Sequence, residues 1–250
     1  LYTSNSVSGA TINEINTNNN FSNITVTGAT TIAGWASTDG GSPIKTVTGN
    51  TFTNWTGGTS AVTGLAVSFS GSSTVSGNLV SNISSGGAIT GIASSSGINT
   101  LTGNTVHTLV STGAAAVTGM SVTGGTTQIV SKNKIYNLEA NNASGTVNGI
   151  LVSAGTTVTI QNNLVGDLRT PIANAANPLV GINITGSTTA NVYFNTVWIN
   201  GSSSGALFSA ANRGDNDTEN INIKNNNIVN IFFICLPPLV LQTNFRKISI

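Results

Sequence analysis

The stretch Val75-Ser76-Gly77-Asn78-Leu79-Val80-Ser81-Asn82-Ile83 decides the fold, because its pattern recurs along most of the chain. The next copy reads Leu101-Thr102-Gly103-Asn104-Thr105-Val106-His107-Thr108-Leu109, again with apolar residues three places before and two places after the first asparagine. That asparagine, called the anchor here, recurs at Asn19, Asn50, Asn78, Asn104, Asn133, Asn163, Asn195 and Asn226. Successive anchors lie 31, 28, 26, 29, 30, 32 and 31 residues apart. This period indicates a solenoid, whereas a β-sandwich has turns about every 8–12 residues and no longer repeat.

Each repeat carries a second signature, apolar-x-Gly-apolar, between two anchors. It occurs at Ile32–Trp35, Val62–Leu65, Ile89–Ile92, Val117–Met120, Val147–Ile150 and Leu179–Ile182. In runs such as Thr157-Val158-Thr159-Ile160 apolar and polar side chains alternate, which is typical of a strand with one inward face. Each repeat therefore holds three short β-type runs, separated by glycine or asparagine turns.

Stacking explains why the repeats are needed. One coil cannot bury its own inward face, but coils about 4.8 Å apart pair each strand with those above and below. We therefore predict an all-β chain, a single right-handed parallel β-helix of about seven to eight three-strand coils over residues 1–231. Inward side chains then form columns, one of which holds Phe52, Val80, Val106 and Ile135.

The pattern stops at Phe232, and Pro237-Pro238 follows soon after. Adjacent prolines remove donors from a strand ladder and end the coil. We expect residues 232–250 to form a C-terminal cap or an irregular tail, and non-native sequence is the alternative interpretation of the change in composition.

A second asparagine follows many anchors by four places. It occurs at Asn23, Asn54, Asn82, Asn137 and Asn230, and Thr108, Asp167 and Ile199 replace it in other coils. Asparagine tolerates left-handed backbone angles, and its amide both donates and accepts, so copies one coil apart can bond to each other. We predict a structural asparagine ladder at this position, with a carbohydrate-binding row as the alternative interpretation.

In these features the chain resembles the pectin-lyase-like right-handed β-helices, whose coils have three strands and stacked asparagines at a tight turn. The resemblance extends over the repeat region, from near residue 19 to near residue 231. It implies a scaffold and carries over no catalytic residue, because fold alone does not specify function.

Composition narrows the possible partners. Charged residues make up 6% of the chain, against roughly 25% in an average protein. A net charge of +1 without any run of Lys or Arg gives no electrostatic basis for binding nucleic acid or an anionic membrane surface. The single cysteine, Cys235, excludes an internal disulfide framework, and no apolar run of about 18 residues predicts membrane insertion. An uncharged polar scaffold of this kind favours an extracellular or cell-surface location.

Carboxylates are too sparse to form a convincing catalytic constellation. Residues 1–212 contain only Glu14, Asp39, Glu139 and Asp167. A glycoside hydrolase needs two carboxyl groups roughly 5–10 Å apart. Glu139 and Asp167 lie about one coil apart, but their offsets of 6 and 4 from their anchors spoil the alignment. His107 follows the inward Val106, so alternation predicts that it points outward.

One segment has the spacing of a calcium ligand set. Asp215, Asp217 and Glu219 could offer oxygens to Ca²⁺, which takes six to eight such ligands. A solvated turn between strands is the alternative interpretation, and no other cofactor is expected.

Threonines suggest a surface row. Outward residues before successive anchors align Thr46, Thr48, Thr74, Thr100 and Thr102. Flat rows of this kind resemble the ice-binding faces of some antifreeze proteins. In the next coil Gln128, Val130 and Ser131 are expected to interrupt the row, and Asn191 and Tyr193 are expected to occupy it later.

Three hypotheses for function follow. The first is a structural or adhesin-like repeat segment of a secreted or cell-surface bacterial protein that presents a long polar surface. The second is a carbohydrate-active β-helix that binds or cleaves a polysaccharide. The third is ice binding through the threonine rows. The ligand, the neighbouring domains and the oligomeric state stay open.

Overall fold

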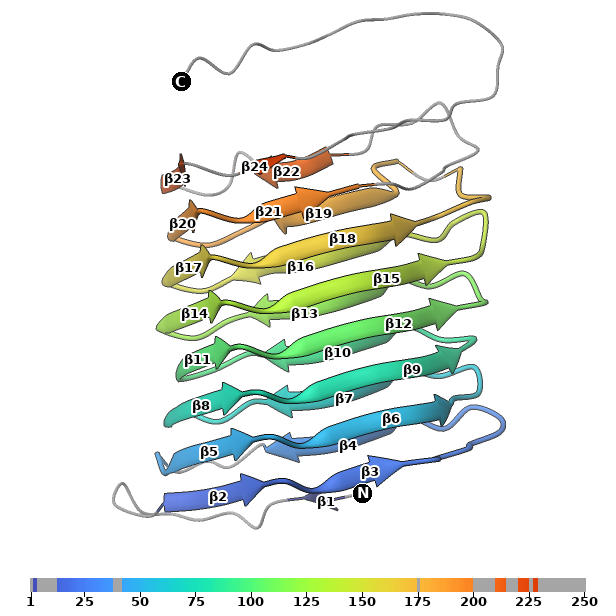
Figure 1. Ribbon diagram of the computed structural model, residues 1–250, viewed down its shortest axis with the longest axis horizontal. Coiled ribbons are helices and arrows are strands. Elements are labelled where there is room, and N and C mark those ends of the chain that lie inside the picture. The colour runs from blue at the N-terminus through green and yellow to red at the C-terminus, as the bar shows by residue number, and fades with distance from the viewer. Residues whose placement is uncertain are drawn as a thin grey trace, which may run out of the picture.

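The chain is an all-β solenoid, shown in Figure 1 as a stack of coils. This computed structural model describes residues 13–37, 42–174 and 176–199, and the backbones of strands 2–3, 210–214, 220–224 and 227–228. No helix occurs among the described residues. The strands form three parallel sheets of eight strands each, called sheets A, B and C here.

The strands alternate between the sheets in chain order. Sheet A contains β1 (Tyr2–Thr3), β4 (Ile32–Ser37), β7 (Val62–Val67), β10 (Ile89–Ser94), β13 (Val117–Thr123), β16 (Val147–Ala154), β19 (Leu179–Ile184) and β22 (Ala210–Gly214). Sheet B contains β2 (Asn13–Thr17), β5 (Ile44–Thr48), β8 (Ser72–Ser76), β11 (Ile98–Thr102), β14 (Thr127–Ser131), β17 (Thr157–Gln161), β20 (Thr189–Tyr193) and β23 (Asn220–Lys224). Sheet C contains β3 (Asn20–Ser22), β6 (Thr51–Thr56), β9 (Leu79–Ser85), β12 (Thr105–Ser111), β15 (Lys134–Ala140), β18 (Leu164–Arg169), β21 (Thr196–Trp198) and β24 (Asn227–Ile228).

Every third strand pairs in parallel, so one coil contains three strands. In sheet A, for example, β10 pairs with both β7 and β13. In Figure 1 the chain crosses the near side through β5 and β6, returns behind through β7 and rises by one coil, which makes the solenoid right-handed. The predicted fold class is confirmed.

The interior consists of stacked apolar columns. Phe52, Val80, Val106 and Ile135 are partners on successive strands of sheet C, as predicted, and all of them are fully buried. These columns remove most of the apolar surface from water, which is the main force that holds the coils together.

The apolar-x-Gly-apolar signature has a steric cause. Gly91 lies in the middle of β10, where a Cβ atom would stand 2.5 Å from Gly119 O and 2.5 Å from Val106 Cγ1. The equivalent Gly64 and Gly119 are similarly crowded, so the position is restricted to glycine because sheet A approaches the inward column of sheet C here.

The predicted tail, residues 232–250, and its boundary at residue 231 lie outside the described residues. Within the described part, no helix is long and apolar enough to cross a membrane.

Candidate functional site

The anchor asparagines form a continuous hydrogen-bond ladder inside the solenoid. The backbone N–H and Nδ2 of Asn78 both donate to Asn104 Oδ1, at 3.0 and 2.9 Å, and Nδ2 also donates to Val47 O at 2.8 Å. The pattern joins Asn50, Asn78, Asn104, Asn133, Asn163 and Asn195, all buried. Each amide thus holds the turn between a strand of sheet B and one of sheet C. Sequence reasoning placed the ladder at another position, although the unbroken recurrence of the anchor was an available signal.

The predicted asparagine row lies on the surface. Asn23, Asn54, Asn82 and Asn137 have φ angles of 59°, 59°, 52° and 57°, as expected for left-handed turns. Asn54 Nδ2 donates to Asn23 Oδ1 and Asn82 Nδ2 to Asn54 Oδ1, both at 3.3 Å in exposed positions. Asn137 Nδ2 donates instead to Thr108 Oγ1 at 2.9 Å. Asn230 lies outside the described residues.

The threonine rows exist on the outer face of sheet B. Thr46, Thr74 and Thr100 are partners on successive strands, and Thr48 and Thr102 flank Ser76 in the same way. In later coils the row of Thr46 runs through Ile129 and Thr159 to Asn191, and the row of Thr48 runs through Ser131 and Gln161 to Tyr193, so Asn191 and Tyr193 occupy the rows as expected.

The predicted interruption of these rows at Gln128 and Val130 was wrong, because the outward residues of β14 lie one place away. Gln128 and Val130 both point inward and are fully buried, because the side chains of β14 alternate from Thr127 onward. Gln128 belongs to a buried polar network, where its Oε1 accepts a hydrogen bond from Ser94 Oγ at 2.6 Å.

The outer face of sheet C carries an aromatic row that sequence reasoning did not recognise. Successive outward partners are Ser81, His107, Tyr136, Gly166 and Trp198. The rings of His107 and Tyr136 stack with centroids 4.8 Å apart and an interplanar angle of 8°. Desolvation by burial lowers the His107 pKa below its ordinary value of 6.5. The signal was available, because these residues occupy the position three places after the anchor.

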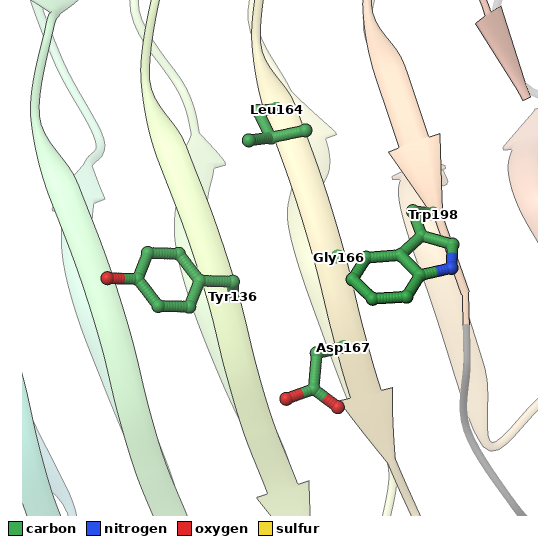
Figure 2. A pocket seen from close by; sticks show the side chains of 5 residues that line it. All are labelled: Tyr136, Leu164, Gly166, Asp167 and Trp198. Atoms are coloured by element: carbon green, nitrogen blue, oxygen red, sulfur yellow. The ribbon is translucent and has the colours of Figure 1, made fainter. Parts of the chain in front are cut away.

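Glycine opens a depression in this row. Tyr136 and Trp198 are 38% and 42% exposed, and the Trp198 ring lies against the bare Gly166 backbone, where a Cβ atom would be 3.3 Å from Trp198 Cε3. Figure 2 shows the two rings on either side of β18, with Leu164 at one end and Asp167 at the other. These five residues, called the aromatic patch here, line a shallow depression of about 360 Å³.

An ion cluster borders the aromatic patch. Arg169 Nε lies 3.0 Å from Glu139 Oε2, and Arg169 Nη1 lies 2.6 Å from Asp167 Oδ1. Arg169 Nη2 also donates to Asn137 Oδ1. Partial desolvation acts to lower the Arg169 pKa, but the hydrogen bonds and charges of Asp167 and Glu139 outweigh it and raise the pKa.

The register explains how these carboxylates meet. Glu139 is the strand partner of Arg169, whereas Asp167 occupies the left-handed turn position with a φ of 49°. Glu139 and Asp167 are therefore out of register with each other, as predicted. Both carboxylates nevertheless bind the guanidinium of Arg169, which was not considered from the sequence. This arrangement favours recognition over acid–base catalysis, because the guanidinium occupies an oxygen of each carboxylate.

Charge is concentrated at this site. Residues 13–37, 42–174 and 176–199 contain seven charged residues, and four of them lie on the outer side of sheet C: Lys134, Glu139, Asp167 and Arg169. Within the same ranges no group of three His, Cys, Asp or Glu side chains could hold a metal ion. The calcium candidates Asp215, Asp217 and Glu219 lie outside the described residues.

Comparison of the chain with protein-family models, curated proteins and solved structures finds no match.

Proposed function

We propose that the chain is an adhesin-like structural segment of a secreted or cell-surface bacterial protein, and that it binds a glycan through the aromatic patch. The observation that carries this proposal is the depression between Tyr136 and Trp198, bordered by the ion cluster, on a scaffold with few other charges.

The aromatic patch has the composition of a sugar-binding surface. Ligand sites combine apolar and aromatic walls with a few placed polar groups. The faces of Tyr136 and Trp198 can pack on the C–H faces of sugar rings, and Asp167 and Arg169 can exchange hydrogen bonds with hydroxyl groups. Tyr136 and Trp198 are two coils apart, a backbone separation of about 10 Å, which accommodates more than one sugar ring.

The charges favour a neutral glycan over a polyuronate. Lys134 and Arg169 are balanced by Glu139 and Asp167, so the formal charge of this face is zero. A polyanionic chain would gain little electrostatic attraction here. In this respect the site departs from enzymes that cleave acidic polysaccharides.

Binding to a panel of soluble neutral glycans and polyuronates, measured by isothermal titration calorimetry, tests the proposal. We expect a neutral glycan to bind and Trp198→Ala to weaken it at least tenfold, which is about 1.4 kcal/mol. Phe194→Ala is the matched control, because Phe194 is 57% exposed and does not line the depression. Equal losses in both variants, or no binding by the unmodified chain, would reject the proposal, and turnover of the glycan would reject a purely binding role.

Ice binding is a second candidate, favoured by the register on sheet B. The outer residues of β5, β8, β11, β14 and β17 include no charged side chain. Most of them are threonine or serine, and the exceptions are Ile44, Ile98, Ile129 and Gln161. Thermal hysteresis that disappears in Thr100→Lys would support this function. Absence of both hysteresis and ice shaping by the unmodified chain would remove it.

A further inference from the structure

A buried amine and a buried carboxamide meet at one carboxylate between β2 and β5. Lys45 is fully buried, and its Nζ lies 2.5 Å from Glu14 Oε2. Asn16 Nδ2 donates to the other oxygen, Glu14 Oε1, at 2.7 Å. One carboxylate therefore contacts both a nucleophile and an amide that it could attack.

The register brings these groups together on the inward face. Glu14 is the strand partner of Lys45, and Asn16 is the partner of Val47, two residues further along β5. Asn16 is itself held in place, because its carbonyl accepts a hydrogen bond from Asn50 Nδ2 at 2.9 Å. The aliphatic stem of Lys45 spans several ångströms, enough to reach a diagonal neighbour on an adjacent strand.

The surroundings of the amine are aromatic and dry. The ring centroids of Phe69 and Trp35 lie 4.9 and 5.9 Å from Lys45 Nζ, and both side chains are almost fully buried. Exclusion of water from the amine strengthens its electrostatic interaction with Glu14.

In the later coils whose side chains the structure describes, the same inward position holds no other amine. The partners of Lys45 in later coils are Ser73, Asn99, Gln128, Val158 and Ala190. Burying a charged group is costly, and apolar replacements of buried ion pairs are often neutral or stabilising. Among the described residues of this column only Lys45 and its partner Glu14 are charged, and an ion pair confined to one pair of coils is poorly explained by packing alone.

We propose that Lys45 and Asn16 form an intramolecular isopeptide bond, with Glu14 as the catalytic proton carrier. Glu14 accepts a proton from Lys45 Nζ, and the neutral amine attacks Asn16 Cγ. The new Nζ–Cγ bond forms, and the Cγ–Nδ2 bond breaks as Glu14 delivers that proton to Nδ2, which leaves as ammonia. The second proton that Nζ gives up on becoming an amide passes through Glu14 to the released ammonia, which departs as ammonium and leaves Glu14 as a carboxylate. The step needs no oxidant, metal or cofactor, and it ties two neighbouring coils covalently.

Intact mass spectrometry of the purified chain tests this bond directly. We expect a mass about 17 Da below that of the sequence, because one ammonia is lost. Trypsin distinguishes the crosslink from a succinimide, which also loses ammonia but leaves Lys45 open to cleavage. The first two basic residues are Lys45 and Lys132, so a linked chain gives a fragment ending at Lys132 and none ending at Lys45.

Variants then assign the atoms. Lys45→Arg and Glu14→Gln should show the full mass, and Asn16→Asp should lose about 18 Da as water instead. Lys132→Arg is the matched control and should keep the 17 Da deficit, because it changes a lysine outside the cluster. A full-mass unmodified chain that releases a fragment ending at Lys45 would show an ordinary buried ion pair and overturn the proposal.

Discussion

Two rows of asparagine run along this solenoid with the same period and opposite surroundings. The anchor row is buried, and each of its side chains makes several hydrogen bonds within the core. In the turn row that begins at Asn23, the exposed Asn23, Asn54 and Asn82 are linked by contacts of 3.3 Å, and the part-buried Asn137 makes a shorter bond of 2.9 Å to Thr108. Breaking a buried hydrogen bond costs more stability than breaking an exposed one, because the remaining partner is left unpaired and away from water. We therefore infer that the anchor row stabilises the fold, whereas residues of the turn row can vary.

The residue types found in successive coils agree with this difference between the anchor row and the turn row. Each described coil keeps asparagine at the anchor, whereas the turn row contains Thr108 and Asp167 as well as asparagine. Asp167 is the residue that joins the ion cluster beside the aromatic patch. The exposed row is thus the place where the scaffold can acquire a binding site without losing its turn.

The largest effect is expected from Asn104→Ala, which breaks the buried row in the middle. It removes the acceptor for two donors of Asn78 and the donor to Val75 O. Leaving such groups unpaired costs about 1–3 kcal/mol each, so we expect a loss of about 3 kcal/mol or more in the free energy of unfolding. Urea denaturation followed by circular dichroism measures it. A loss below about 1 kcal/mol would contradict the role given to the ladder.

Asp167→Asn introduces asparagine, the common residue of the turn row, and tests whether Asp167 acts in glycan binding rather than in stability. Asparagine accepts the left-handed angle, and Asp167 is 33% exposed, so the denaturation midpoint should stay within experimental error. Arg169 loses one charged partner, and we expect glycan affinity to fall about fivefold, or roughly 1 kcal/mol.

Calorimetry with the glycan and denaturation of the same protein sample check both expectations together. Unchanged affinity would remove the ion cluster from the site. A large loss of stability would instead make Asp167 a structural residue.

The fold followed from local pattern, because apolar periodicity and the anchor spacing are both visible in sequence. The same anchor spacing aligns Tyr136, Gly166 and Trp198 in one row, but it does not show the depression, which depends on the Trp198 ring lying against the Gly166 backbone. Burial of the anchors was also hidden, since asparagine at a turn suggests an exposed side chain. The reach of Arg169 to two carboxylates depends on side-chain geometry that spacing does not contain.

A smaller effect is expected at Asn82 in the exposed row. Its φ of 52° strains a residue with a Cβ, so Asn82→Ala should cost about 1 kcal/mol of unfolding free energy. Asn82→Gly removes the same side chain but accepts this angle, and it should change stability by less than about 0.5 kcal/mol. Thermal and urea denaturation of the two variants compare backbone strain with the 3.3 Å contact to Asn54. Equal losses would show that the side-chain contact matters more than the angle.

The smallest expected effect is the pH dependence of stability that arises from His107, the neighbour of Thr108. Thr108 Oγ1 accepts from Asn137 Nδ2 and lies 2.9 Å from His107 Nδ1, so it can donate its own proton to a neutral imidazole. Because burial lowers the His107 pKa in the folded state, the unfolded chain binds the proton first as pH falls below about 6.5. Stability should be complete above pH 6.5 and decline slightly below it, until the folded-state pKa is passed. Denaturation midpoints at several pH values, compared with His107→Gln, isolate this contribution. A folded-state His107 pKa above 6.5 by NMR titration would reverse the sign and contradict the neutral, Thr108-bonded imidazole.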